Sequence, residues 1–599
     1  MTSDPFSMDI SRHVWETRYR AAGETTVSES WQRVAHAIAA AETRDRDAWA
    51  GRFRGLLDGF RFLPGGRILA GAGTGHRVTL FNCFVMGEIA DDLESIFEAL
   101  KEGALTMQQG GGVGYDFSTL RPAGMVAAAT GTIASGPVSF MRIWDAMCAT
   151  MLSTGARRGA MMATLRCDHP DIEAFVDAKR DPAELRHFNL SVQASDAFMA
   201  AVERDADWPL VFPLRAGEAA DGPVVERRWS GSGAAVPCRV IRTLRARELW
   251  QRILRAAYDT AEPGVLFVDT VNRENTLRDR ETLSATNPCG EIPLPPYGAC
   301  DLGSLNLTAF VTSPFAAGAR LDLAALDAAA GLAVRFLDDV IDVSRYPLPA
   351  QADEARRKRR VGLGVTGLAD ALVMLGLDYD SDAARTLAAQ ALQTVRDAAY
   401  RASVGLAREK GAFPGFDRDA FLASGFAARL PAELRAAIAD DGIRNSHLLA
   451  IAPAGTISLL ANNCSSGIEP VFAAVAERRV LGRDGAYRTH RVVDLALQRW
   501  QQAGHPGMPP ALVEARQIDP RAHLAMQAAL QPYVDNAISK TINVAADTPF
   551  EHFADLYRQA HALGLKGCTV FRPNPVTGAI LSEPSAARVP CCSVEREAD

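Results

Sequence analysis

The segment NPCGEIPLPPYGACDLGSLNL (Asn287–Leu307) places a carboxamide, a thiol and a carboxylate within five residues, at Asn287, Cys289 and Glu291. Prolines at 288, 295 and 296 disfavour regular structure, so Cys289 is expected on a constrained loop. If that loop is extended, alternate side chains point the same way, and all three groups can meet one ligand face. The apolar run after it, with Cys300, is typical of a strand.

Composition narrows the class of protein. The chain has 599 residues, 48% hydrophobic and 23% charged, which is enough for a very large core. A net charge of −7 argues against a protein that grips nucleic acid by its phosphates. The basic cluster EARRKRR (Glu354–Arg360) is expected to be a solvated helix face. Ten scattered cysteines do not suit a disulfide scaffold, so any cysteine pair is a candidate for redox chemistry.

The N-terminal segment and the most apolar stretch of the sequence predict a cytoplasmic protein. The start MTSDPFSMDISRHVWETRYR has early acidic residues and no apolar core of a signal peptide. The most apolar window, Val361–Asp380, is interrupted by Asp370 and several glycines. That pattern favours a buried core helix over a membrane span.

The order of predicted elements indicates an α/β protein. Residues 1–75 are expected to be mainly helical, with Trp31, Val34, Ile38 and Ala39 on one face. From residue 76 to 574, β-like and helical runs alternate; a helix from Arg245 is stopped by Pro263 and Gly264 before a strand. The stretch Asp207–Val240 is expected to be irregular. Residues 575–599, ending VPCCSVEREAD, are expected to form a flexible tail.

Two further features support a functional role for Cys289 over simple packing, which is the commoner fate of a cysteine. Cys83, in FNCFV, and Cys300 both lie in β-like runs that a barrel can bring together. Glycine-rich turns also recur, although each alone is most often only a turn. In PAGTIS, the backbone N–H groups of residues 454–456 and the hydroxyls of Thr456 and Ser458 can cradle a phosphate where a helix begins.

From Phe81 to Arg572 the sequence resembles the catalytic chain of ribonucleotide reductases, most closely the adenosylcobalamin-dependent class II enzymes. The resemblance rests on an ordered set of motifs: FNCFV, GGGVGYDFSTLRP, GARRGAMMATL, NPCGEIPLPPYGACDLGSLNL, RRVGLGVTGLAD, APAGTISLL, SSGIEPVF, DNAISKTINV and GCTVFRPN. It implies a ten-stranded α/β barrel, made of two antiparallel halves of five parallel strands, with a finger loop through its centre.

The resemblance also implies roles for the active-site residues. Cys289 becomes a thiyl radical that takes the 3′ hydrogen of the ribose, Glu291 removes the 3′-hydroxyl proton, and Asn287 orients the sugar hydroxyls. Cys83 and Cys300 reduce the 2′ position and end as a disulfide. The substrate-binding residues implied are Asn82, Ala454, Gly455, Thr456, Ile457 and Ser458.

Regulation and re-reduction are implied in the same way. Asp91 matches the position that holds the effector ribose, Arg121 lies near the effector phosphates, and Arg158 lies on the loop that links effector to substrate base. No N-terminal ATP-binding cone is expected. Cys591 and Cys592 match the tail cysteines that re-reduce the active-site disulfide, although here the two are adjacent rather than spaced.

The radical source is inferred by elimination and likeness. A class I large chain needs two adjacent tyrosines where this chain has Val570 and Phe571. A class III chain needs a C-terminal glycyl radical, and the last eleven residues contain no glycine. Adenosylcobalamin remains, expected to keep its own base on cobalt because the Asp-x-His-x-x-Gly signature is absent. The expected partners are ribonucleoside diphosphates, dNTP or ATP effectors, thioredoxin or a similar reductant, and a second copy of the chain.

Three alternatives stay open. The chain can be a class I large subunit with a separate radical-generating subunit, or a non-catalytic nucleotide-binding paralogue, although Cys83, Cys289, Glu291 and Cys300 are all intact. A structural zinc protein is disfavoured because no paired Cys/His motifs have suitable spacing, and no metal site is expected. Cys148, Cys167, Cys238 and Cys464 are expected to be packing residues, and Cys568 has no assigned role.

Overall fold

The structure is a computed structural model that describes residues 5–126, 131–153, 157–158, 160–215, 217–481 and 487–573. Its main sheet has ten strands in the described part, in the order β1-β14-β2-β3-β6-β7-β11-β21-β20, with β17 also paired to β14. Strands β2, β3, β6, β7 and β11 run parallel to one another. The sheet strands are β1 (Phe62–Pro64), β2 (Cys83–Val85), β3 (Gly112–Asp116), β6 (Met161–Arg166), β7 (Phe188–Ala194), β11 (Gly264–Phe267), β14 (Ala299–Asn306), β17 (Val361–Thr366), β20 (Thr541–Asn543) and β21 (Gly567–Phe571).

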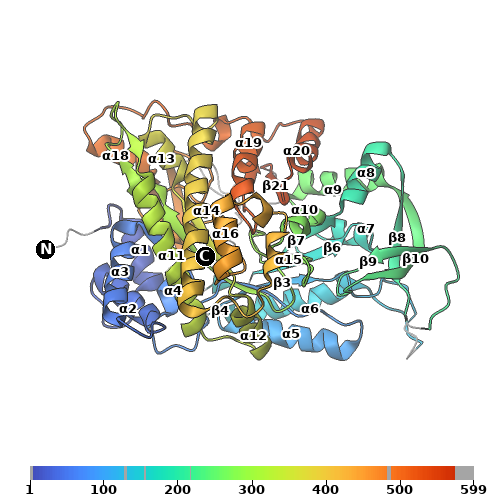
Figure 1. Cartoon of the computed structure of the whole chain (residues 1–599). Coiled ribbons are helices and arrows are strands. Elements are labelled where there is room, and N and C mark those ends of the chain that lie inside the picture. The colour runs from blue at the N-terminus through green and yellow to red at the C-terminus, as the bar shows by residue number, and fades with distance from the viewer. Residues whose placement is uncertain are drawn as a thin grey trace.

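Helices connect the parallel strands and cover the sheet, as expected for an α/β protein. The long helices α11 and α14 pack side by side, and α11 also packs against α2 and α3 of the N-terminal region (Figure 1). The helices are α1 (Asp9–Val14), α2 (Val27–Ala39), α3 (Arg46–Leu57), α4 (Gly66–Gly71), α5 (Leu93–Gln108), α6 (Pro137–Thr150), α7 (Ile172–Asp177), α8 (Asp196–Arg204), α9 (Ala246–Thr260), α10 (Val268–Glu274), α11 (Leu323–Val343), α12 (Pro349–Lys358), α13 (Leu368–Met374), α14 (Asp382–Lys410), α15 (Arg418–Leu422), α16 (Ala432–Asp441), α17 (Gly455–Leu460), α18 (Leu495–Gln502), α19 (Pro520–Leu530) and α20 (Phe550–Ala562).

The N-terminal region is helical and packs on α11. Helix α2 begins with a capping box, in which Thr26 accepts from the backbone of Glu29 and the Glu29 side chain accepts from the backbone of Thr26. Its predicted apolar face, from Trp31 to Ala39, is buried as expected. Phe53 of α3 meets Phe336 of α11 edge-on, with the ring centroids 5.2 Å apart. Glu42, just after α2, is buried and paired with Arg335 of α11 at 2.6 Å.

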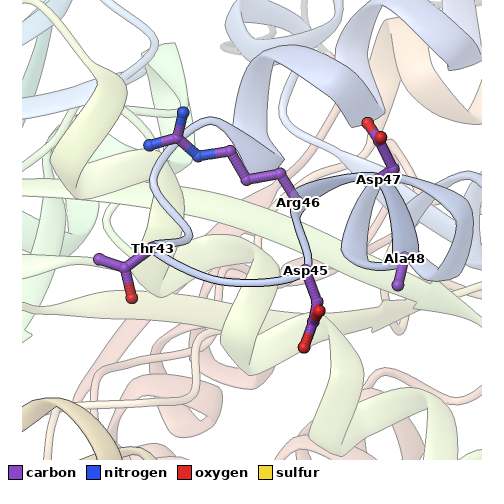
Figure 2. Close-up of a pocket in the computed structure, with 5 residues that line it drawn as sticks. All are labelled: Thr43, Asp45, Arg46, Asp47 and Ala48. Atoms are coloured by element: carbon purple, nitrogen blue, oxygen red, sulfur yellow. The ribbon is translucent and has the colours of Figure 1, made fainter.

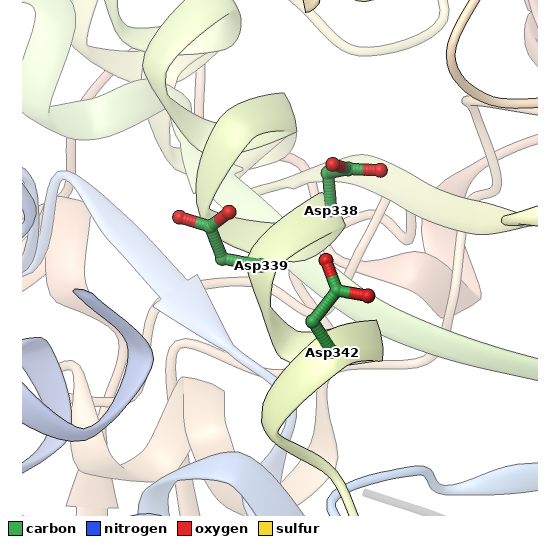
Figure 3. Close-up of side chains that lie close together, drawn as sticks. All are labelled: Asp338, Asp339 and Asp342. Atoms are coloured by element: carbon green, nitrogen blue, oxygen red, sulfur yellow. The ribbon is translucent and has the colours of Figure 1, made fainter. Parts of the chain in front are cut away.

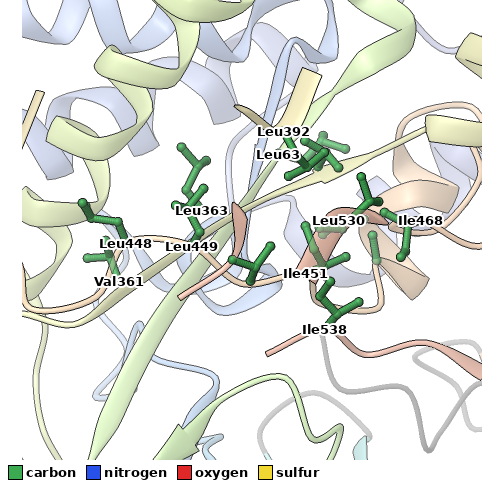
Figure 4. Packing of buried hydrophobic residues seen from close by; sticks show 14 of the residues in the cluster. Leu63, Val361, Leu363, Leu392, Leu448, Leu449, Ile451, Ile468, Leu530 and Ile538 are labelled. Carbon is green, nitrogen blue, oxygen red and sulfur yellow. The ribbon is translucent and has the colours of Figure 1, made fainter. Parts of the chain in front are cut away.

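The second part of the sheet is built around β14. This strand pairs antiparallel with β1 and β2 and parallel with β17. Beyond β17, single bridges join Leu363 to Leu449 and Ile451 to Ile538, both parallel. The side chains of this region pack together in Figure 4, where Val361, Leu448 and Leu449 lie close to one another. At the other end, β21 runs parallel to β20 and antiparallel to β11.

Two expectations about local structure were wrong. The stretch Asp207–Val240 is not irregular: β8 (Asp207–Pro213), β9 (Val224–Arg228) and β10 (Ala235–Arg245) form a three-stranded sheet in the order β8-β10-β9. The window Val361–Asp380 is not one helix, because its first six residues form strand β17, and only Leu368–Met374 is helical. A short fully buried apolar run carries no periodicity that separates strand from helix.

The basic cluster also departs from the expected solvated face. Helix α12 ends at Lys358, and the next two residues, Arg359 and Arg360, are buried. Arg359 pairs with Asp338 of α11, and Arg360 pairs with Glu281 at 2.6 Å. The cluster therefore helps to join α11 to the segment before β14. Within the described residues, no helix is both long and apolar enough to cross a membrane.

Smaller strand pairs complete the described fold. They are β4 (Leu152–Ser153) with β5 (Arg157–Arg158), β12 (Ala285–Thr286) with β13 (Pro293–Leu294), β15 (Val311–Thr312) with β16 (Arg320–Leu321), and β18 (Val475–Leu481) with β19 (Tyr487–Val493). The pair β12–β13 matters most for the site, because it frames the segment that carries Cys289.

Candidate active site

The finger segment, residues 282–298, runs from the end of the β11–α10 unit to the start of β14. Its first arm is held by the parallel strands: the backbone oxygen of Ser284 accepts from Thr164 Oγ1 at 2.8 Å and from Gln193 Nε2 at 2.7 Å. Nearer the tip, Asn189 Nδ2 donates to the Pro288 oxygen at 2.7 Å. These donors belong to β6 and β7, so the sheet itself fixes the direction of the finger segment.

Close packing against β3 also positions this segment. A Cβ atom added at Gly114 would lie 1.8 Å from the backbone oxygen of Thr286, a distance that no real side chain can adopt. Gly114 is therefore required by the approach of the finger segment to the strand. On the other side, Ala537 N donates to the Glu291 oxygen at 2.8 Å, so the tip contacts both parts of the sheet.

The tip is a turn and not an extended loop, which corrects the expected alternation of side chains. Gly290 has a φ of 83° and its N–H donates to the Asn287 oxygen at 3.1 Å. The turn brings Asn287 and Glu291 together, and Asn287 Nδ2 donates to Glu291 Oε1 at 2.7 Å. The Asn287 Oδ1 atom accepts from the Ile292 N–H at 3.0 Å, which fixes the orientation of the amide.

Cys83 joins this pair from β2. Asn287 Nδ2 donates to Cys83 Sγ at 3.1 Å, and the Cys83 thiol lies 3.9 Å from Glu291 Oε1. Cys300 of β14 is the direct cross-strand partner of Cys83 in the antiparallel register. Opposite residues in such a pair have Cα atoms about 4.5–5.5 Å apart, which lies within the range of about 4.4–6.8 Å that a disulfide spans. Cys83 and Cys300 are both buried, whereas Cys289 is partly exposed.

Burial dominates the electrostatics of the site. Glu291 is buried, and desolvation raises its pKa to about 7. Its Oε2 atom has no hydrogen-bond partner in the described part of the chain, so a lone pair is left for a ligand. Burial, and then the nearby Glu291 carboxylate, raise the pKa of Cys83 well above its ordinary value. Both Cys83 and Cys300 are therefore thiols at neutral pH.

The predicted phosphate loop begins a short helix. Helix α17 starts at Gly455, Ala454 N donates to Ser466 Oγ at 2.8 Å, and Ser458 Oγ donates to the Gly455 oxygen at 3.1 Å. The segment Ala454–Ser458 follows Ile451, which bridges to Ile538 beside the Ala537 contact to the finger segment. Asn82, immediately before Cys83, is buried, and its Nδ2 has no partner among the described residues.

Of the three residues predicted to bind the effector, Asp91 and Arg121 are in contact. Arg121 Nε donates to Asp91 Oδ2 at 2.8 Å just before α5, and Arg215 Nη2 lies 3.3 Å from the same oxygen. Arg215 follows β8, in the stretch that was expected to be irregular, so no sequence pattern paired it with Asp91. Arg158 lies in strand β5, in the two-residue pair with β4. Cys591 and Cys592 lie outside the described residues.

Sequence reasoning also missed Asp301, which follows Cys300 on β14. Asp301 is fully buried, neither carboxylate oxygen has a hydrogen-bond partner in the described structure, and desolvation raises its pKa well above the ordinary value. The signal was the motif GACDLGSLNL itself, in which a lone acid interrupts an apolar strand. Val570 is buried in β21 and Phe571 ends that strand, where a class I chain needs tyrosines.

One acidic cluster has the spacing of metal ligands. Asp338, Asp339 and Asp342 lie close together on α11 (Figure 3). Cations of the protein already occupy them: Arg359 Nε lies 2.8 Å from Asp338 Oδ1, Arg359 Nη2 lies 2.8 Å from Asp342 Oδ2, and Lys410 Nζ lies 2.6 Å from Asp339 Oδ1. The cluster is part of the ion-pair network between α11, α14 and Arg359.

Two cavities of the described structure lie apart from the predicted catalytic residues. One, of 630 Å³, is lined by Thr43, Asp45, Arg46, Asp47 and Ala48 at the start of α3 (Figure 2). The other, of 290 Å³, lies at the carboxyl ends of β6, β7 and β11, where Thr282 and Ser284 of the finger segment line it. None of the predicted catalytic residues lines either cavity.

Comparison with known proteins identifies the class. The model of the ribonucleotide reductase barrel domain matches residues 81–571, and that of the ribonucleotide reductase all-alpha domain matches residues 6–77. The chain belongs to the ribonucleotide reductase family, which confirms the resemblance seen in its motifs.

The names of individual relatives are more specific than the family models, because they include a cofactor and a substrate class. A vitamin B12-dependent ribonucleoside-diphosphate reductase of Mycobacterium tuberculosis is 41% identical over 589 residues, covering 94% of this chain and 78% of the relative. An enzyme of the same name from Thermoplasma acidophilum is 34% identical, covering 89% of this chain and 66% of the relative. A ribonucleoside-diphosphate reductase large subunit of Danio rerio is 29% identical, covering 80% and 64%.

Proposed function

We propose that this chain is a vitamin B12-dependent ribonucleotide reductase that converts ribonucleoside diphosphates to 2′-deoxyribonucleotides. The observation that carries the proposal is the cluster at the tip of the finger segment. There Asn287 bridges Glu291 and Cys83, Cys300 lies opposite Cys83, and Cys289 is the one partly exposed thiol of the three.

The arrangement supports a separate chemical role for each of these residues. Cys289, as a thiyl radical, takes the 3′ hydrogen atom, while Glu291 accepts the proton of the 3′-hydroxyl through a carboxylate oxygen. The 2′-hydroxyl leaves as water with a proton from Cys83 or Cys300. These two thiols supply two electrons and two protons in all and form one S–S bond; one proton leaves in the water and the other is gained at C2′. Glu291 then returns its proton to the 3′-oxygen, and Cys289 returns the hydrogen atom to C3′. Asn287 holds Glu291 and Cys83 toward the same sugar.

The residues present fit adenosylcobalamin as the radical source. Bound adenosylcobalamin supplies a carbon-centred radical that can take a hydrogen atom from a thiol. Such a large group can reach only a thiol with an exposed surface, and Cys289 is partly exposed while Cys83 and Cys300 are not. Val570 and Phe571 offer no phenol for a radical relay from a second subunit. Cys289 is the residue of the finger segment that would meet the bound cofactor.

The finer architecture proposed is a closed barrel of ten strands. The second set of five parallel strands would be β14, β17, the segment around Leu449–Ile451, the segment Ile538–Asn543 and β21. The single bridges Leu363–Leu449 and Ile451–Ile538 support this ring, as does the antiparallel pairing of β21 with β11. The phosphate loop Ala454–Ser458 would then lie at the rim above Glu291, with Asn82 near the sugar.

The proposed regulation and partners follow the same likeness. Asp91 and Arg121 would hold the ribose and phosphates of a dNTP or ATP effector, with Arg158 on the loop toward the substrate base. A homodimer is supported by apolar side chains four and eight residues apart on one face of α5: Leu93, Phe97 and Leu105, which are 63%, 50% and 39% exposed. Thioredoxin or a similar dithiol would reduce the Cys83–Cys300 disulfide through Cys591 and Cys592.

The test is an anaerobic assay of deoxynucleotide formation by the purified chain, with CDP and CTP in parallel. We expect turnover when adenosylcobalamin is added and no second protein is supplied, with CDP preferred. Activity that appears only with a diiron or dimanganese subunit would place the chain in class I. No activity under either condition would favour the non-catalytic paralogue.

A further inference from the structure

Tyr297, at the end of the finger segment, occupies a backbone position that its residue type does not favour. Its φ is 59°, in the left-handed region that side chains other than glycine seldom adopt. The Gly298 N–H donates to the Pro295 oxygen at 2.9 Å, so residues 295–298 form a β-turn with Pro296 second and Tyr297 third. A positive φ at the third position is the mark of a type II turn, where glycine is normal. A large residue held there indicates a constraint from elsewhere.

The contacts of the Tyr297 ring identify this constraint. A Cβ added at Gly87 would lie 2.4 Å from the Cζ and hydroxyl atoms of Tyr297, so the ring tip rests on the backbone of Gly87, two residues beyond β2. The hydroxyl donates to the Glu102 carboxylate of α5, at 3.1 Å to Oε2 and 3.3 Å to Oε1. Tyr297 thus fills the junction between the end of β2 and the middle of α5.

The same turn sets the pairing of the two strands that carry the buried cysteines. The Val85 N–H of β2 donates to the Gly298 oxygen at 3.0 Å. The next pairs along are Phe84 with Ala299 and Cys83 with Cys300. Cys300 is therefore three residues from Tyr297, and its distance from Cys83 depends on the place where this turn fastens β14 to β2.

Helix α5 connects the junction to the proposed regulatory surface. Its N-cap, Asp92, follows Asp91, the partner of Arg121, and its outer face carries Leu93 and Phe97. The helix is fixed on β3, because a Cβ at Gly103 would lie 1.8 Å from the hydroxyl oxygen of Tyr115. Because Glu102 is the neighbour of Gly103 on this helix, any shift of α5 on β3 also moves the carboxylate that accepts from the Tyr297 hydroxyl.

We propose that Tyr297 is a positioning residue, which holds β14 against β2 at the spacing that the Cys83–Cys300 pair needs and ties that spacing to α5 through Glu102. The inference rests on the proposed roles of Cys83 and Cys300 as the redox pair. From this position the ring of Tyr297 contacts Gly87 and its hydroxyl reaches Glu102.

The test measures the thiol–disulfide equilibrium of Cys83 and Cys300 directly, without cofactor or turnover. The full chain, with Cys591→Ser and Cys592→Ser to remove competing tail thiols, is equilibrated in dithiothreitol redox buffers, alkylated and analysed by peptide mass spectrometry. For Tyr297→Phe, which keeps the ring and loses the hydroxyl, we expect the dithiol-to-disulfide ratio to rise about three- to tenfold, the scale of one hydrogen bond.

Further variants separate positioning from general stability. Glu102→Gln keeps an acceptor oxygen and should match wild type, whereas Glu102→Leu should match Tyr297→Phe. Tyr258→Phe removes another half-buried hydroxyl, which donates to the Thr548 oxygen at 2.7 Å, and should leave the ratio unchanged. An unchanged ratio in Tyr297→Phe, with or without a lower Tm, would overturn the proposal. Failure of the parent chain to form the Cys83–Cys300 disulfide would remove the proposed redox pair, and the inference with it.

Discussion

At the scale of single residues, the position of Glu291 determines how the site responds to pH. Burial raises its pKa to about 7, against an ordinary value of 4.5. A carboxyl group that must accept a proton is active only when ionised, so turnover should rise with pH through about 7 and level off above it. The check is kcat/KM between pH 5.5 and 8.5, where Glu291→Gln should be about 10²–10⁴-fold less active than wild type above pH 7. The difference should shrink toward pH 5.5, because the wild-type carboxyl is then protonated.

The raised pKa of Glu291 also makes the folding stability depend on pH, and this stability should fall as pH rises. Between pH 4.5 and 7 the folded chain binds a proton at Glu291 that the unfolded chain does not, so the contribution of this group to folding is lost as pH rises through 7. Denaturant unfolding of Glu291→Gln should show a smaller loss of stability from pH 5 to pH 8 than wild type. An identical loss in both proteins would contradict the buried, protonated state.

Cys289 is expected to contribute chemistry and little binding. Cys289→Ala should therefore abolish turnover while nucleotide affinity, measured by equilibrium dialysis, stays near that of wild type. The matched control is Cys148→Ala, since Cys148 of α6 is buried against Met107 of α5 and belongs to no catalytic motif. Multiple turnovers by Cys289→Ala would remove this thiol from its central role.

At the scale of elements, the close approach of β12 to β3 leaves no room for a side chain at Gly114. Gly114→Ala would push a methyl group against the Thr286 oxygen and displace the finger segment. A shift of about 1 Å at reacting groups costs about 100-fold in rate, so kcat should fall by that order. Gly405→Ala is the control, because nothing lies within 4 Å of its added Cβ on α14, and it should stabilise the chain by up to about 1 kcal/mol. Equal kcat in the two variants would count against close packing of the finger segment.

Elements also show what the sequence could and could not predict. Helix α2 and the α9–β11 join were predictable, because an amphipathic period and a Pro-Gly stop are local signals. Strand β17 was mistaken for helix, since its glycines are required by contact with a distant segment: a Cβ at Gly364 would lie 2.3 Å from the Ala450 oxygen. In the candidate site, Cys83, Asn287, Glu291 and Cys300 were singled out by motif. Their contacts through a turn, the contact of Arg215 with Asp91 and the contacts of Tyr297 depend on tertiary packing.

At the scale of the whole molecule, the apolar face of α5 predicts the state of association. Phe97→Asp should convert a dimer to a monomer, because it places a charge in the centre of the proposed interface. Leu563→Asp is the matched control, since Leu563 is equally exposed, at 50%, beyond α20. Sedimentation with and without effector measures both variants. A wild-type monomer under both conditions would refute the interface.

The second prediction at this scale concerns the two cysteines of residues 575–599. The double variant Cys591→Ser and Cys592→Ser should turn over with dithiothreitol, which is small enough to reach buried Cys83 and Cys300, but poorly with thioredoxin. The measurement is the ratio of initial rates with the two reductants. Full activity of the double variant with thioredoxin would mean that the tail is not the shuttle.

The pairing of β21 with β11 has a consequence for how the protein is made. Strand β11 ends at Phe267, but the strand that covers its edge begins only at Gly567. During synthesis at about 5–20 residues per second, the first five parallel strands therefore emerge from the ribosome many seconds before their edge is closed. An unpaired strand edge is a template for aggregation, so the nascent chain should depend on chaperones that shield this edge until β21 has been synthesised.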